Sequence, residues 1–447
     1  MTESLAPEPV KIDDDHVSVR IADLLIGSEL RFPLCNTSGI LLVAEGTTIT
    51  SQLKKRIASY GSENVRIHAA DVGRVTLTAS EVDGRVGLGV DSELVAKIDK
   101  IVNQGQMFVK NEGPPMRDEM AVNGPKAYDS DQKEELEQQH QTTSDALNVM
   151  MDEVASGRSL DGQQVTKLVA KYVSDLAKDK DLVLNIALMA NKEGLTERSL
   201  QTALLSMTIG VEMGFDAGNV QLLGICGLLH DWGMTKVPEE IVSATGPLTR
   251  LQFLEIQKHP IHSIDMLNSI TGIPGLVPLV VFQVHERLDG SGYPRGRQSS
   301  AIHPLARILQ VADNYTALTS PRNYAKPVTA YGAVECLLHL ASERVLDSKV
   351  ITALLNAFSL FPIGSFVTLD DGSIAQVLRA NRGRFNQPVV QLVRNSQGEK
   401  IAPSDETVVD LTNSELSVVQ AIPTPGRDEV VFSPEVLTGS ASYQFQS

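Results

Sequence analysis

Residues 284–296 read VHERLDGSGYPRG, and the interpretation of the whole chain depends on this stretch. It gathers one histidine, two acids, two arginines and three glycines around a Tyr-Pro pair. Because glycine adopts backbone conformations that other residues disfavour, we expect a tight loop here. The apolar runs at 278–283 and 304–320 have helical spacing on either side of it. The loop is therefore either part of a functional site between two helices or only a polar turn.

Helical spacing extends over most of the chain on both sides of this loop. From about residue 130 to 360, apolar residues recur three and four positions apart, for example at 219–233 and in one continuous segment at 249–270. Outside this region the spacing is that of short strands separated by turns. The sequence thus predicts a multidomain protein whose central all-α helical bundle is flanked by a small N-terminal α+β module and a small C-terminal β module.

The domain boundaries follow from changes in period and composition. The segment before residue 129 is rich in Pro, Gly and charge, which is typical of a linker. The predicted parts are a disordered N-terminus at 1–15, an α+β module at 16–70, a linker with partial structure at 71–128, connecting helices at 129–180, the main helical domain at 181–360, a β module at 361–421 and a tail at 422–447.

Composition excludes several classes of protein. A formal net charge of −16 argues against a general nucleic-acid binder, which needs basic surface. Cys35, Cys226 and Cys336 are few, scattered and odd in number, so no disulfide framework is expected. The apolar runs are too short to span a bilayer, and the acidic start is not a secretory signal. We therefore expect a cytoplasmic protein that does not bind membranes.

Imidazoles and carboxylates recur within the apolar helical segments, where polar groups are expected to face a shared interior. Each alone is more often a satisfied core residue than a ligand, and Asp313 could simply bond a neighbour within its helix. Together they favour a metal site, because buried ionisable groups are costly unless they are paired or bound to a metal. The candidate metal ligands are His230, Asp231, His259, His285 and Asp313.

The sequence resembles the HD-GYP family, a branch of the HD-domain metal-dependent phosphohydrolases, over roughly 180–360. The resemblance rests on LLHDWG, KHP, HERLDGSGYPRG and HPLARILQVADNYTALTSPRNY. It implies a bacterial cyclic di-GMP phosphodiesterase acting in signal transduction, with two divalent metal sites holding iron or manganese. Asp231 would bridge the metals, and His230 and Asp231 would be the catalytic pair. His230 and Asp313 would serve one metal, and His259 and His285 the other.

The resemblance also implies roles for residues around the metals. Arg322 matches the family arginine that contacts substrate. Two further candidates for substrate binding are Arg198, whose guanidinium could bind a phosphate bidentately, and Lys326, one position from the family lysine. In the family the GYP loop also serves signalling partners, and its acids and arginines either contact ligands or hold the loop through internal salt links. The residues of this loop are Glu286, Arg287, Asp289, Gly290, Gly292, Tyr293 and Pro294.

Several positions depart from the family pattern. Val284 and Arg198 stand where the family has metal-binding histidines, and Gly194 and Met234 replace an acid and a lysine. His262 is an alternative ligand on the same helix as His259. We therefore predict a phosphodiesterase and keep as the alternative a catalytically weak or inactive member that acts as a cyclic di-GMP sensor or a scaffold. The long polar helix expected at 130–157 suggests a homodimer.

Overall fold

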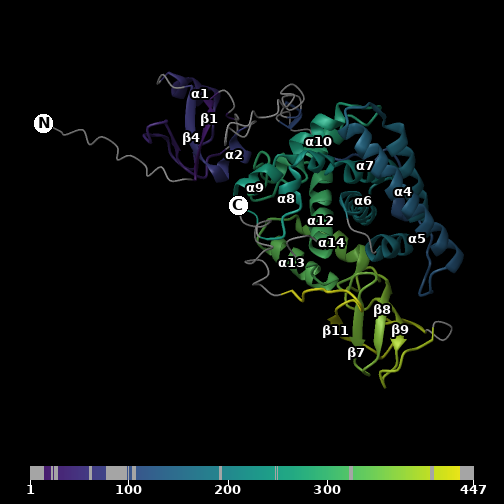
Figure 1. The fold of residues 1–447 in the computed structure, drawn as a ribbon. Coiled ribbons are helices and arrows are strands. Elements are labelled where there is room, and N and C mark those ends of the chain that lie inside the picture. Colours follow the sequence, from purple (N-terminus) through teal and green to yellow (C-terminus); the bar gives the residue numbers. More distant parts are fainter. Residues whose placement is uncertain are drawn as a thin grey trace.

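The chain folds into three parts, which the computed structural model shows in Figure 1. A small α+β module is followed by a large helical part and then by an antiparallel sheet, which confirms the predicted fold class. The module and the C-terminal sheet lie on opposite sides of the helical part in this view. The structure describes residues 15–21, 24, 29–59, 63–76, 98, 100–102, 107–190, 194–246, 248, 250–321, 326–402 and 407–432. The predicted disordered N-terminus lies almost wholly outside these residues.

The N-terminal module is a sheet covered by short helices. Its strands run in the order β1-β4-β2-β3, and β1 pairs antiparallel with β4. Thr50 caps α1 by accepting a hydrogen bond from the Leu53 amide. The last helix, α2, crosses the boundary predicted at residue 70, because Val72 and Val75 belong to the core of this module. The elements are β1 (His16–Arg20), β2 (Leu34–Cys35), β3 (Leu41–Val43), α1 (Ser51–Ala58), β4 (Asn64–His68) and α2 (Ala69–Val75).

The helical part surrounds α6, whose residues from Ser199 to Val211 are all buried. The long α4 lies on the outside of the bundle (Figure 1). In the described residues, no helix combines the length and apolar character needed to cross a membrane. The helices are α4 (Ser130–Ala155), α5 (Gln163–Met189), α6 (Leu195–Glu212), α7 (Ala217–Leu229), α8 (Glu239–Val242), α9 (Arg250–Ile256), α10 (His259–Leu267), α11 (Val277–Gln283), α12 (Pro304–Thr319), α13 (Ala330–Ser342) and α14 (Ser348–Phe358).

Short elements connect these helices. The pair β5 (Leu160–Asp161) and β6 (Ile270–Thr271) forms a parallel ladder, and the 3-10 turns are η2 (Met116–Glu119), η3 (Trp232–Lys236) and η4 (Ser299–Ala301). The single helix expected at 249–270 is wrong, since α9 ends at Ile256 and α10 begins at His259. Pro260 explains the break, because proline lacks the amide that a continuous helix would need there.

The C-terminal module is a five-stranded antiparallel sheet in the order β10-β9-β8-β7-β11. Its strands are β7 (Phe366–Leu369), β8 (Ile374–Arg379), β9 (Val389–Arg394), β10 (Val408–Asp410) and β11 (Val418–Ile422). The predicted start of the tail at 422 coincides with the end of β11. Beyond it, the chain returns to the helical part, where Val430 exchanges backbone hydrogen bonds with Pro327 and Thr329. We call residues 423–432 the return segment.

A buried ion network joins this sheet to the helices. Arg379 of β8 binds both carboxylate oxygens of Asp179 at 2.8 Å, and its guanidinium lies 4.8 Å from the centre of the Tyr128 ring. Asp179 is non-helical (φ −155°, ψ 91°) and marks a kink inside α5. Asp181 lies 3.6 Å from the same guanidinium, and its Oδ1 has no hydrogen-bond partner among the described residues. The network therefore contains one well-matched carboxylate and one that is poorly compensated.

Asp181 makes stability depend on pH. Burial, only partly offset by Lys180 and Arg379, raises its pKa from 3.8 to about 6. The folded state thus holds a proton that the unfolded chain releases, so this contribution to stability is present below about pH 4 and is lost as the pH rises through about 6. Asp181→Asn should stabilise the protein above pH 6 by at most roughly 3 kcal/mol and have little effect at pH 4.

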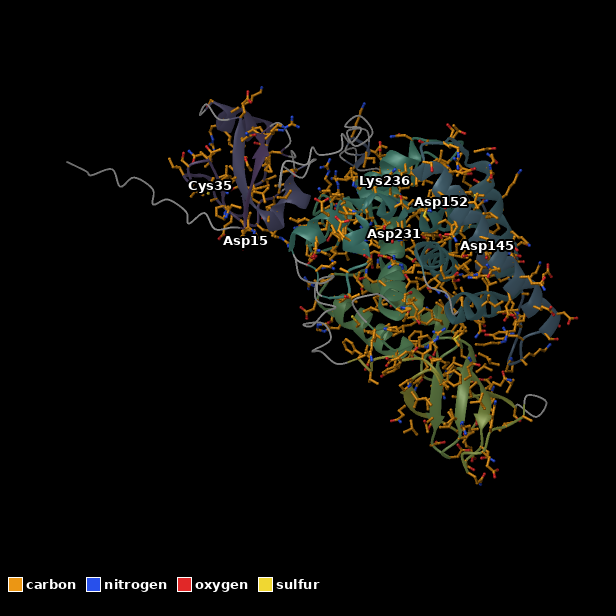
Figure 2. All side chains as sticks on the ribbon, viewed as in Figure 1. Asp15, Cys35, Asp145, Asp152, Asp231 and Lys236 are labelled. Carbon is orange, nitrogen blue, oxygen red and sulfur yellow. The ribbon has the colours of Figure 1, made fainter. Side chains whose placement is uncertain are left out.

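Thermal unfolding at several pH values checks this expectation. Asp145→Asn, at an exposed position on α4 (Figure 2), is the matched control and should show no such trend. A stability difference between Asp181→Asn and the wild type that stays constant from pH 4 to 7.5 would contradict the assignment.

Candidate metal centre

The five predicted ligands converge from five helical elements at the centre of the helical part, where Figure 2 labels Asp231. His230 is the C-cap of α7, and Asp231 follows it at the start of η3. His259 is the first residue of α10, His285 follows the end of α11, and Asp313 lies within α12. Residues from 230 to 313 thus come together because helix ends and one helix interior meet at one point.

Asp231 is the hub of this arrangement. Its Oδ1 lies 3.3 Å from Nε2 of His230, 3.2 Å from Nε2 of His259 and 3.5 Å from Nε2 of His285. Asp313 lies on the other side, with Oδ1 3.6 Å from His230 Nε2 and Oδ2 3.6 Å from His285 Nδ1. A single carboxylate oxygen is therefore shared by three imidazoles.

The ligand atoms form two groups that each fit one cation. Asp231, His259 and His285 make one group, and His230, Asp231 and Asp313 make the other, with the ligand atoms of each group within 4.8 Å of one another. His230 Nε2 and Asp231 Oδ1 are buried and have no hydrogen-bond partner in the part of the chain that the structure describes. A divalent metal between them would satisfy both atoms, and imidazole with carboxylate is a donor set that suits Zn, Mn or Fe. The residues present fit a metal centre.

Backbone carbonyls orient two of the imidazoles. His230 Nδ1 lies 2.8 Å from the carbonyl oxygen of Gly227, and His259 Nδ1 lies 2.7 Å from that of Ile256. Because a carbonyl can only accept, each Nδ1 carries the hydrogen and each Nε2 is directed at Asp231. Such bonds behind the ligand fix the ring and its tautomer in metal sites.

His285 is held by its neighbours from the loop. Its ring stacks on Tyr293, with centroids 5.0 Å apart and an interplanar angle of 7°. Its Nε2 lies 2.8 Å from Nε2 of His259, a distance at which the two rings either share a proton or face a common cation. The Tyr293 side chain is thus part of the wall of the centre.

The pKa values of His230 and His259 are shifted in opposite directions. Burial opposes a charged His230, but the carboxylates of Asp231 and Asp313 outweigh it and raise its pKa to about 9. Burial and then the charge of His285 lower the pKa of His259. Burial would raise the pKa of Asp231, yet the surrounding histidines, His230 first, hold it well below its ordinary value. Without a metal, the protonated His230 therefore supplies the positive charge beside the two carboxylates. Metal binding would displace this proton.

The GYP loop is held from inside by a buried acid. Glu286 is fully buried and accepts hydrogen bonds from the backbone amides of Arg295 and Arg297, at 2.8 and 2.7 Å. Burial raises its pKa to about 7, even though these amides favour the charged form. Gly290 has φ +82°, and a Cβ on Gly292 would overlap the backbone around Glu286. Glu286 thus supports the loop rather than lining the metal centre.

The other two polar residues predicted in the loop have different surroundings. Asp289 Oδ1 accepts from the amide and hydroxyl of Ser291, which closes a local turn. Burial lowers the pKa of Arg287, and Arg31 of the N-terminal module is close enough to add to this effect. The N-terminal module therefore lies near the loop.

The structure describes two of the three residues that were predicted to bind substrate. Arg322 lies outside the described residues. Lys326 is mostly exposed and pairs with Asp428 of the return segment at 2.7 Å. Arg198 is half-buried in the first turn of α6, after Gly194 at the N-cap. The substrate-binding roles of these three residues stay predictions.

The family differences have distinct structural settings. Val284, which replaces a histidine, is fully buried in the main apolar core. Met234 packs in a small apolar cluster with Val237 and Ile241. His262 is half-buried and is not in either group of candidate ligands among the described residues. Val284 and Met234 thus fill their positions by apolar packing, and the five candidate ligands remain.

Comparison with known proteins identifies the helical domain. Residues 181–350 match the HD domain family. A cyclic di-GMP phosphodiesterase of Pseudomonas aeruginosa is 28% identical over 268 residues, covering 60% of this chain and 64% of that protein. Another, of Borreliella burgdorferi, is 29% identical over 228 residues, covering 50% and 56%. The 3'3'-cGAMP-specific phosphodiesterase 1 of Vibrio cholerae is 35% identical over 179 residues, covering 39% and 41%.

These matches agree with the site. The chain matches the HD domain family over residues 181–350, and its relatives confirm the predicted resemblance to the HD-GYP branch. It spans less than two thirds of the length of each of these three relatives.

Proposed function

We propose that this protein is a metal-dependent phosphodiesterase that hydrolyses cyclic di-GMP in bacterial signalling. The observation that carries the proposal is the shared Oδ1 of Asp231, which serves two groups of buried imidazole and carboxylate ligands. Relatives named as phosphodiesterases of cyclic di-GMP and of 3'3'-cGAMP support a cyclic dinucleotide as the substrate class.

The chain's own residues account for the parts of such a reaction. Asp231 would bridge two metal ions, with His230 and Asp313 on one side and His259 and His285 on the other. Bound in this way, two iron or manganese ions would supply hydroxide at neutral pH and neutralise the phosphoryl oxygens. The Gly227 and Ile256 carbonyls keep the imidazole lone pairs directed at the centre. His230, whose pKa the neighbouring carboxylates raise to about 9, would release its proton if a metal were bound.

Three protein ligands in each group are compatible with catalysis. A catalytic metal commonly has three protein ligands and leaves a position open for water or substrate. The replacement of a family histidine by buried Val284 therefore reduces the ligand set without emptying it.

We place the activity in the cytoplasm, where scattered free cysteines are ordinary. Partner binding through the GYP loop and pairing through α4 stay predictions.

The alternative is a sensor or scaffold that binds the nucleotide without turnover. Arg198 and Val284 favour it, since neither side chain can ligate a metal where the family has histidine. A guanidinium at position 198 is suited to bidentate phosphate binding, which needs no metal. The two functions therefore differ in whether metal and turnover accompany nucleotide binding.

A turnover assay separates them. Purified protein is incubated with cyclic di-GMP or 3'3'-cGAMP, with manganese and separately with anaerobic ferrous iron, and the products are resolved by chromatography. We expect linear dinucleotide or GMP at least 100-fold above Asp231→Ala, because that change removes the bridging ligand (about 3 kcal/mol or more). An unchanged substrate peak with both metals, together with measurable nucleotide binding, would instead establish the sensor.

A further inference from the structure

Ser263 lies behind the metal centre and has no role assigned by the sequence patterns. It sits on α10 one turn after His259 and is fully buried. Its hydroxyl donates to the carbonyl oxygen of His230 at 2.6 Å and accepts from the amide of Gly233 at 2.9 Å. One side chain thus satisfies two backbone groups of the turn that follows α7.

These two hydrogen bonds are made to residues on either side of Asp231 in the sequence. One holds the residue before it, and the other holds the second residue after it. Asp231 itself has φ −101° and ψ 3°, in the sparsely populated bridge region of backbone conformation. Residues in this region keep their conformation when their surroundings determine it. The direction of the Asp231 carboxylate therefore depends on how the two flanking peptides are held.

Gly233 allows the turn that contains Asp231 to pack directly against α10. A Cβ at this position would overlap the backbone carbonyl of His259 and the backbone amide of Ser263. The turn with His230 and Asp231 can therefore lie against α10, which carries His259, with no side chain between them. Through this contact, the Ser263 hydroxyl connects the ligands on α7 and η3 to the ligand on α10.

We propose that Ser263 is a positioning residue, which fixes the Asp231 carboxylate between the two groups of histidines. The inference rests on the proposed metal centre and adds a residue that does not itself touch the metal. Without the hydroxyl, the His230 carbonyl and the Gly233 amide lose a buried partner and the turn can rotate. Asp231 Oδ1 would then no longer lie within reach of all three imidazoles.

The test measures manganese binding to the full chain by calorimetry. Ser263→Ala should weaken Mn²⁺ binding about tenfold or more, in line with the loss found when groups that orient metal ligands are removed. The matched control is Ser206→Ala, because Ser206 is an equally buried serine whose hydroxyl donates to the Ala203 carbonyl within its own helix, α6. Ser206→Ala should keep the wild-type affinity even where its melting temperature falls.

A second variant separates positioning from stability. Ser263→Thr retains the hydroxyl and should stay within about threefold of the wild-type affinity, even if its extra methyl lowers the melting temperature. If Ser263→Ala does not accumulate as folded protein, Ser263→Cys takes its place, since its thiol is only a weak donor. Wild-type affinity in Ser263→Ala or Ser263→Cys, or an equal loss in Ser206→Ala, overturns the inference.

The outcomes also distinguish this inference from the proposed function. A wild type that binds Mn²⁺ without hydrolysing cyclic dinucleotides removes the enzymatic function, and the affinity ratio still decides the role of Ser263. If the wild type hydrolyses the nucleotide and Ser263→Ala keeps the wild-type affinity for Mn²⁺, the enzymatic function stands and the role of Ser263 is refuted. A wild type that binds no Mn²⁺ removes the metal centre and this inference together.

Discussion

Replacing Asp231 by asparagine should remove manganese binding from both ligand groups at once. The two groups share Asp231 Oδ1, whereas each of the other four ligands belongs to one group only. An amide keeps the size of the side chain but loses its charge, and it is a weaker ligand than a carboxylate. We expect the affinity for Mn²⁺ to fall by at least about 100-fold, equivalent to about 3 kcal/mol.

The number of Mn²⁺ ions bound distinguishes a ligand that both groups share from a ligand that belongs to one group. Calorimetry on metal-free protein should give about two Mn²⁺ for the wild type, about one for Asp313→Asn or His259→Ala, and none for Asp231→Asn. Asp265→Asn, at an exposed position on α10, is the control and should bind as the wild type does. One remaining ion in Asp231→Asn would show that the two groups do not depend on a common carboxylate.

Replacing Arg379 by methionine should have the largest effect on stability. Its side chain is only 5% exposed and donates to Asp179 at two positions and to the Lys126 carbonyl. Removing one partner of a buried pair leaves an uncompensated charge and costs about 3–5 kcal/mol. Thermal unfolding followed by circular dichroism should show a melting temperature lower by roughly 10 °C.

Two further variants locate the cause of this loss. Arg382→Met removes a guanidinium that is 57% exposed and pairs with Glu212, so it should cost under about 1 kcal/mol. Adding Asp179→Asn to Arg379→Met removes the stranded charge, while its Oδ1 can still accept from the Leu182 amide. The double variant should recover part of the lost stability. No recovery would mean that packing, rather than charge, dominates at Arg379.

The five candidate metal ligands could be selected from the sequence because their chemistry is unusual where they occur. His230, Asp231, His259, His285 and Asp313 interrupt apolar helical segments, and no simple surface role explains polar groups there. The structure brings all five together. The helical bundle and its two flanking modules were predictable for a related reason, since each has its own hydrophobic period.

Residues that act through tertiary contacts could not be predicted in this way. Ser263 is one small polar residue in an amphipathic helix, and only the approach of Gly233 gives it two partners. A polar residue one turn after a ligand, on its buried side, is the one signal that could have found it. Arg379 and Asp179 are 200 residues apart, and nothing local in either segment indicates their pairing.

The return segment shows that a domain defined by sequence and a unit that is physically complete need not coincide. Val430 pairs with residues 327 and 329, Phe432 packs against Gly332, and Arg427 donates to the carbonyl of Met189. Residues of the return segment therefore cover part of the surface of the span that matches the HD domain family. Excised at its sequence borders, it would expose backbone groups that the intact protein keeps paired, so the physically complete unit extends to the return segment.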